Sequence, residues 1–192
     1  DAELLDYTWN WGGYIDCQAF TNSFRTPRIN VCISDDVLSV KRSFADNLFM
    51  NIFPRKPGSV NGSDWIRNYP DLSRALKQCA KLRKQFLQYF TDGILIGNCI
   101  LTKPCPGTHI SSYVLPDKLL IIVLNESGNE RDITFEYDIL PWLKHQSHGY
   151  GMHIYDSDGN SIGYKEISNE ANIQSTRLLK NLDMEIYEIT AK

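Results

Sequence analysis

A short aromatic segment near the start of the chain combines the side-chain types that bind a sugar. It runs from Asp6 to Tyr14 and contains Trp9 and Trp11, with Asn10 between them. Sugars present apolar C–H faces that stack on aromatic rings, while their hydroxyls form hydrogen bonds with Asn and Asp. Aromatic residues that pack into a core give the same pattern. Trp9 and Trp11 are therefore candidate ring-stacking residues, with core packing as the alternative.

Two acidic residues follow directly after a predicted strand. Residues 28–34 have the length and the β-branched content of a strand, and Asp35 and Asp36 come next. These carboxylates either cap the helix that follows or contact a hydroxyl of a bound ligand, and we favour capping. The pair does not form a catalytic dyad by itself.

A second predicted strand also ends in polar residues. It covers residues 48–53, and Pro54 prevents it from continuing. Asn51, Arg55 and Lys56 lie at this end of the strand. The two cations either bind a polar or anionic group of a substrate or belong to a solvated loop.

Neither a metal nor a cofactor is predicted. The turn at residues 156–160 places Asp156, Asp158 and Asn160 at alternate positions, as a calcium loop does. Gly159 comes one place too early and the distal acidic ligand is missing, so we predict a hairpin turn. Zinc is not predicted either, because no CxxC motif or Cys/His cluster occurs. The cysteines are Cys17, Cys32, Cys79, Cys99 and Cys105.

A strand–helix–strand unit should position these candidates. Between the two predicted strands, Val37, Val40 and Phe44 repeat at helical spacing. Two strands joined by a helix form a parallel pair, so residues 28–53 predict a parallel sheet. Two strands cannot close a sheet or cover both its faces, and this half of the fold looks incomplete.

A long helix is predicted over residues 70–91. Pro70 suits its first position and Gly93 its end. Arg83 projects into the middle of the apolar side, so its guanidinium should meet a carboxylate or backbone carbonyl groups. We predict that it anchors the helix rather than contacting a substrate. The opposite side is basic, and we predict a solvated face rather than a nucleic-acid site, in line with the net charge of −3. Its basic residues are Arg74, Lys77, Lys81 and Lys84.

After Gly93 the helical period changes to the alternation of short strands. We predict a β-sandwich of roughly 100 residues. The resulting domains are residues 1–92, of α/β type, and residues 93–192, of all-β type. The predicted strands cover residues 94–101, 109–115, 119–125, 132–137, 151–155, 161–166 and 184–190.

No membrane-spanning helix is predicted, because the chain has no apolar segment of about 18 residues. It opens with Asp1-Ala2-Glu3 rather than an initiator Met, and we expect that processing or truncation removed upstream residues. No signal peptide is visible. The compartment is left open, with the periplasm or secretion favoured.

Several motifs together resemble the C-terminal end of a (β/α)8-barrel glycoside hydrolase. They are residues 51–57 (NIFPRKP), 82–86 (LRKQF), 118–125 (KLLIIVLN) and 185–189 (EIYEI). The α-galactosidase-like group and its relatives are nearest. The resemblance implies that residues 28–91 are the last two βα units of a barrel and that residues 94–192 are its accessory sandwich.

The resemblance also implies a carbohydrate substrate bound at the carboxyl ends of the strands. Hydrolysis of an O-glycosidic bond normally requires two carboxyl groups, and in the resembling enzymes these come from earlier strands, which this chain lacks. We therefore expect the chain alone to be inactive. A non-catalytic carbohydrate-binding or interaction protein, in which the sandwich does the binding, is the alternative.

Overall fold

The computed structural model describes residues 8–11, 28–32, 37–52, 65–143, 149–167 and 172–192. The chain divides into two compact units, Asp1–Ala80 and Lys81–Lys192, and the division falls inside helix α3 (Pro70–Gln85). The predicted boundary at Gly93 rests on a different criterion, the change of sequence period, and stays a prediction.

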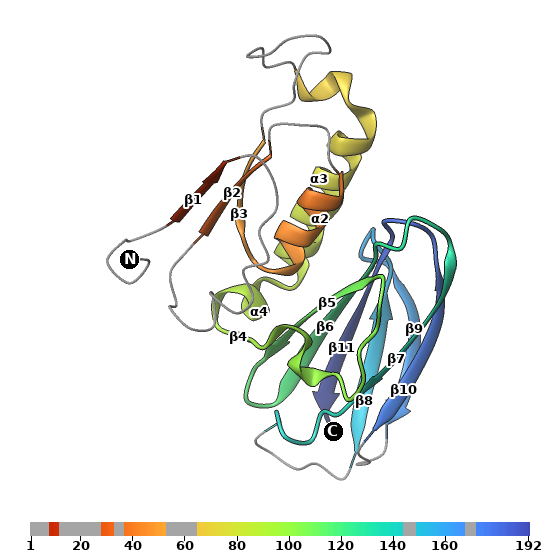
Figure 1. Ribbon diagram of the computed structural model, residues 1–192. Helices are drawn as coiled ribbons and strands as arrows, with labels where there is room; N and C mark the ends of the chain where they lie inside the picture. Colours follow the sequence, from red (N-terminus) through yellow and green to blue (C-terminus); the bar gives the residue numbers. More distant parts are fainter. Residues whose placement is uncertain (1–7, 12–27, 33–36, 53–64, 144–148, 168–171) are drawn as a thin grey trace. The chain divides into compact units, whose positions relative to one another are not determined.

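The first unit contains a parallel three-stranded sheet (Figure 1). Strands β1 (Thr8–Trp11), β2 (Arg28–Cys32) and β3 (Phe49–Ile52) lie in that order, and both neighbouring pairs are parallel. Helix α2 (Val37–Ala45) joins β2 to β3. The predicted strand–helix–strand unit and its parallel pairing are confirmed, and β1 adds a strand that the sequence did not predict.

Helix α2 buries its apolar residues and ends at a left-handed residue. Val40 and Phe44 are 0% and 2% exposed. Asn47, with φ 57°, follows the helix, and the Leu48 N–H donates to the Ser43 carbonyl at 2.8 Å. This bond is typical of a helix whose last carbonyls are capped by a left-handed turn.

The predicted helix over residues 70–91 is divided in two. After the short 3-10 turn η2 (Ile66–Asn68), α3 runs over Pro70–Gln85 and α4 over Leu87–Thr91. Phe86 leaves helical geometry, with φ −107° and ψ 26°. The Tyr89 N–H then bonds to the carbonyl three residues earlier, at 3.0 Å. The turn shifts the helical register, and Leu87, projected onto the apolar side, is instead 49% exposed.

The second unit contains two antiparallel sheets (Figure 1). A six-stranded sheet has the order β4-β5-β6-β11-β8-β9, and a two-stranded sheet pairs β10 with β7. The strands are β4 (Ile94–Leu95), β5 (Thr108–Val114), β6 (Lys118–Asn125), β7 (Arg131–Tyr137), β8 (Tyr150–Tyr155), β9 (Ser161–Ile167), β10 (Ile173–Leu179) and β11 (Met184–Ala191).

Two strand predictions in this unit require correction. The strand predicted over residues 94–101 is only β4, because Gly97 takes φ 58° and a 3-10 turn, η3 (Gly97–Ile100), follows. Strand β10 was not predicted. One of its inward-facing residues is the polar Ser175, which is 9% exposed. This serine interrupts the alternation of apolar and polar residues by which a strand is predicted.

One apolar core lies between the two sheets. It contains Leu119, Ile121 and Val123 of β6 together with Phe135 of β7 and Ile173 of β10. We call this side of the six-stranded sheet the inner face and the opposite side the outer face.

The outer face is also covered along its centre. Leu120, Ile122 and Leu124 of β6 are each 0% exposed. Phe90 of α4 meets Tyr113 of β5 edge to face, with ring centroids 5.0 Å apart, and Phe86 meets Tyr155 of β8 in the same way at 5.1 Å. These ring pairs place the end of α3 and all of α4 against the outer face.

Candidate functional site

The carboxyl ends of the parallel strands bring two of the predicted site residues into one row. Trp11 of β1 is paired with Val31 of β2, which is paired in turn with Asn51 of β3. Trp9 lies two positions earlier on β1. In open α/β sheets and in barrels, ligands bind at this end of the strands. Asp35, Asp36 and Arg55 lie outside the described residues.

One exposed aromatic residue, directly before η2, was not among the predicted site residues. Trp65 is 69% exposed, and the guanidinium carbon of Arg67 lies 5.3 Å from the centroid of its ring. A tryptophan between a strand end and the start of the next helix was the available signal. An open indole of this kind can stack on a sugar.

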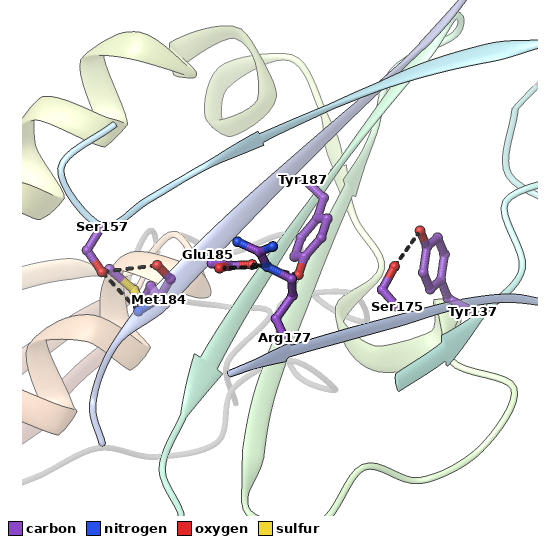
Figure 2. A network of polar contacts seen from close by, with 7 residues as sticks. All are labelled: Tyr137, Ser157, Ser175, Arg177, Met184, Glu185 and Tyr187. Atoms are coloured by element: carbon purple, nitrogen blue, oxygen red, sulfur yellow. Dashed lines mark hydrogen bonds and ion pairs between the residues drawn. The ribbon is translucent and has the colours of Figure 1, made fainter. Parts of the chain in front are cut away.

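A buried carboxylate lies on the inner face of the second unit (Figure 2). Glu185 of β11 is 4% exposed, and Arg177 of β10 donates from Nε to both of its oxygens, each at 3.1 Å. The hydroxyl of Tyr187 donates to the same carboxylate at 2.8 Å. Because Arg177 belongs to the other sheet, this ion pair ties the two sheets together.

Tyrosine hydroxyls share this apolar space. Burial raises the pKa of Tyr187 far above its ordinary value, and the Glu185 carboxylate raises it further, since both disfavour a phenolate. Burial also raises the pKa of Tyr137, whose hydroxyl lies 3.3 Å from Ser175 Oγ. These hydroxyls therefore stay protonated at neutral pH and act as hydrogen-bonding groups of the core.

A third contact in Figure 2 closes the turn before β11. The Met184 N–H donates to Ser157 Oγ at 2.9 Å. The Ser157 hydroxyl also donates to the Asp183 carboxylate, which is not drawn in the figure. The three residues fix the end of β8 to the start of β11.

A second glutamate of β11 lies on the outer face. Glu188 accepts the hydroxyl of Tyr89 at 3.0 Å and that of Tyr155 at 3.2 Å. Burial, and then the Glu188 charge, raise the pKa of Tyr89. Residues separated by an odd number of positions point to opposite faces of a strand, so Glu185 and Glu188 cannot act together on one glycosidic bond.

Arg83 lies beside the buried stripe of the helix rather than in its middle. Its guanidinium carbon lies 5.1 Å from the centroid of the Phe90 ring, and the side chain is partly buried. Leu82, with 0% exposure, occupies the centre of the stripe. The role of Arg83 as an anchor of this helix stays a prediction.

The turn at residues 156–160 is a hairpin turn, as predicted, because it joins the antiparallel neighbours β8 and β9. Asp156 accepts from the Asn160 backbone at 2.8 Å, the Asn160 side chain at 3.0 Å and the Asp158 N–H at 2.9 Å. Partial burial alone would raise the pKa of Asp156. These bonds and the nearby Lys81 outweigh it and lower that pKa.

Asn125-Glu126-Ser127 matches the common acceptor pattern for N-glycosylation, but its asparagine is part of the core. Asn125 is 0% exposed, and its amide donates to the carbonyls of Asn129, Leu179 and Lys180 at 2.7, 2.9 and 3.1 Å. Its Oδ1 accepts the Ser127 N–H at 3.0 Å. A side chain held in this way is a staple between two turns and is closed to a sugar-transferring enzyme.

The thiols of Cys79, Cys99 and Cys105 are free. Burial raises the pKa of Cys79 to about 12, which keeps it protonated. Cys99 is exposed, and Cys105 lies 3.5 Å from the Thr108 hydroxyl. Among the described residues, no group of three or more His, Cys, Asp or Glu side chains could hold a metal ion. No helix within the same residues is long and apolar enough to span a membrane.

The chain resembles parts of several glycoside hydrolase structures. It matches a family 5 glycoside hydrolase from Bacteroides vulgatus with a TM-score of 0.56 and 14% identity, over 92% of this chain and 45% of that chain. An α-amylase from Geobacillus thermoleovorans in complex with acarbose matches with a TM-score of 0.53 and 10% identity, over 92% of this chain and 42% of the amylase. A family 30 endoxylanase from Clostridium papyrosolvens matches with a TM-score of 0.52 and 13% identity, over 96% of this chain and 48% of the endoxylanase.

The likeness is one of fold. The chain spans less than half the length of each of these three structures. No protein-family model and no curated protein matches the sequence. The chain therefore has a partial glycoside-hydrolase-like fold, and the comparisons do not single out the α-galactosidase-like group.

Proposed function

We propose that this chain is the C-terminal part of a barrel-type glycoside hydrolase. In this proposal β1, β2 and β3 are the last strands of a (β/α)8 barrel, α3 closes it, and the two antiparallel sheets form an accessory β-sandwich. The observation that carries the proposal is the order of elements, in which parallel strands are followed by one long helix and then by antiparallel sheets around one core. The structural neighbours support it.

The substrate is a carbohydrate, bound at the carboxyl ends of the parallel strands. Trp9 and Trp11 stack on sugar rings, while Asn51, Asp35 and Asp36 bond to hydroxyls, and Arg55 contacts a polar substituent. The two carboxyl groups that cleave the bond are supplied by strands upstream of Asp1. The sequence resemblance makes α-galactosides the first linkage to test, and the neighbours add α-glucans and xylans.

An assay of the 192-residue chain tests this division of labour. Aryl α-galactosides, starch and xylan should be hydrolysed at background rates, because the acid and the nucleophile or base are absent. Turnover that Asp35→Asn or Asp36→Asn abolishes would make those residues catalytic and would contradict the proposal.

A non-catalytic carbohydrate-binding protein is the second candidate. The observation that favours it is the exposed aromatic side chain of Tyr164 on the outer face of the six-stranded sheet, which is 52% exposed. The two candidates differ in one measurable property. The first requires that the upstream strands confer turnover, whereas the second requires binding alone.

A further inference from the structure

Three residues on neighbouring strands form a row across the outer face. Glu188 of β11 is paired with His153 of β8, which is paired with Tyr164 of β9. Met152 and Ile154, on either side of His153, contact the inner core. Alternation along the strand therefore places His153 on the outer face. We call Glu188, His153 and Tyr164 the outer row.

The ring of Tyr164 is supported from below and open above. A Cβ added to Gly151 of β8 would lie 2.9 Å from the Tyr164 hydroxyl oxygen and 3.1 Å from its Cε2. The ring thus lies against the backbone at Gly151. It is 52% exposed, and its centroid lies 4.7 Å from that of His153, with an angle of 53° between the rings. A supported ring with an open face is a stacking surface.

Charged groups surround this ring. Glu166, which lies two positions after Tyr164 on β9, forms an ion pair with Lys192, and the two side chains are 71% and 44% exposed. Exposed ion pairs contribute little to stability, so this pair can exchange partners at small cost. On the other side of His153, the Glu188 carboxylate is held by the Tyr155 hydroxyl at 3.2 Å.

We propose that the outer row, together with the neighbouring ion pair of Glu166 and Lys192, is a second carbohydrate-binding surface. A sugar ring stacks on Tyr164 and its hydroxyls bond to Glu166, Lys192 and His153, while Glu188 borders the surface. The proposal takes the class of ligand from the proposed function, but it needs no catalytic carboxylate. A sugar is favoured over a protein because the site offers one open ring flanked by charges, whereas a stable protein interface buries about 800 Å² on each partner.

Native gel electrophoresis in the presence of soluble starch or xylan tests this surface with the 192-residue chain. The unchanged chain should be retarded by at least one polysaccharide. Tyr164→Ala should weaken the affinity roughly three- to tenfold, the range expected for one aromatic contact. Gly151→Ala should weaken it as well, because the added Cβ displaces the ring while leaving it present. Ile162→Ala, at another exposed apolar residue of β9, should change nothing.

Retardation that is absent in the unchanged chain, or equal in the chain and in Tyr164→Ala, overturns the proposal. Thermal unfolding of each variant shows whether it is folded. If Tyr164→Ala does not fold, the affinity of Gly151→Ala for the polysaccharide tests the proposal in its place. Self-association that depends on both Tyr164 and Ile162, without retardation, would instead assign the surface to a second copy of the chain.

The outcomes separate this proposal from the proposed function. Binding that Trp11→Ala abolishes and Tyr164→Ala leaves intact overturns the outer row but keeps the hydrolase. Binding that depends on Tyr164 supports the outer row even where a chain extended upstream shows no turnover, which would remove the hydrolase alone.

Discussion

Two glutamates of the same strand have opposite surroundings. Glu185 lies on the inner face, 4% exposed, where an arginine and a tyrosine bind both its oxygens. Glu188 lies on the outer face, where it is partly exposed and accepts two tyrosine hydroxyls. The difference shows that the acidic groups of the second unit belong to two separate systems. One holds the two sheets together, and the other borders the surface for which we propose carbohydrate binding.

Removal of each glutamate should separate the two systems most strongly. Glu185→Ala should lower the free energy of unfolding by about 3 kcal/mol, because it leaves Arg177 and Tyr187 without their buried acceptor. Glu188→Ala should cost about 1 kcal/mol, since Glu188 is partly exposed and accepts only neutral hydroxyl donors. Urea unfolding of both variants measures the difference. Equal losses would contradict the assignment of two systems.

Loss of the buried amide of Asn125, at the end of β6, should have the next largest effect on stability. Asn125→Ala should lower the free energy of unfolding by about 2 kcal/mol, because three backbone carbonyls lose their donor. The exposed Asn129→Ala serves as the control and should change stability by less than about 0.5 kcal/mol. An Asn125→Ala variant as stable as the control would refute the staple.

Much of this organisation was accessible from the sequence. The parallel pair β2 and β3 was predicted because a continuous apolar run, a helical period and a second run follow one another in residues 28–53. Strand β10 was missed because Ser175 and Arg177 replace apolar residues. Residues 70–91 were predicted as one continuous helix because a projection at a constant angle cannot anticipate the turn at Phe86.

The outer row was inaccessible for a different reason. Its members come from three strands, and their alignment depends on the register of β11, β8 and β9. Periodicity identifies the face on which a residue lies but not its neighbour on the next strand. Trp11 and Asn51 were predicted one at a time, and only the register of the parallel sheet places them in one row.

Two turns of the second unit offer a matched pair of glycines, Gly159 between β8 and β9 and Gly128 between β6 and β7. Gly159 and Gly128 both have positive φ, 74° and 87°. A Cβ at Gly159 would lie 2.4 Å from Gln85 Oε1 and 3.3 Å from Leu82 Cδ2, whereas nothing lies within 4 Å at Gly128. Both alanine variants should lose about 1 kcal/mol from backbone strain. Gly159→Ala should lose about 1 kcal/mol more, and identical losses in thermal unfolding would show that the hairpin does not pack on α3.

The inner face should also respond to alkaline pH. Tyr187 has a raised pKa in the folded state, so its contribution to stability is complete below its ordinary pKa of 10 and is lost as the pH rises above that value. Tyr187→Phe removes the titrating hydroxyl. Between pH 10 and 11 the free energy of unfolding of this variant should therefore fall less than that of the unchanged chain, by up to about 1.4 kcal/mol. Urea unfolding across this range measures it. Identical slopes for the variant and the unchanged chain would contradict the buried phenol.

The most direct test of the account is turnover by a longer polypeptide. The 192-residue chain is extended upstream of Asp1 to include the preceding strands, and hydrolysis of aryl α-galactosides, starch and xylan is compared with that of the chain alone. The account predicts turnover only in the extended protein, lost when a strand-end carboxylate upstream is replaced by its amide and weakened by Trp11→Ala. Turnover by the 192-residue chain alone, or none in an extended protein that is folded, would contradict it.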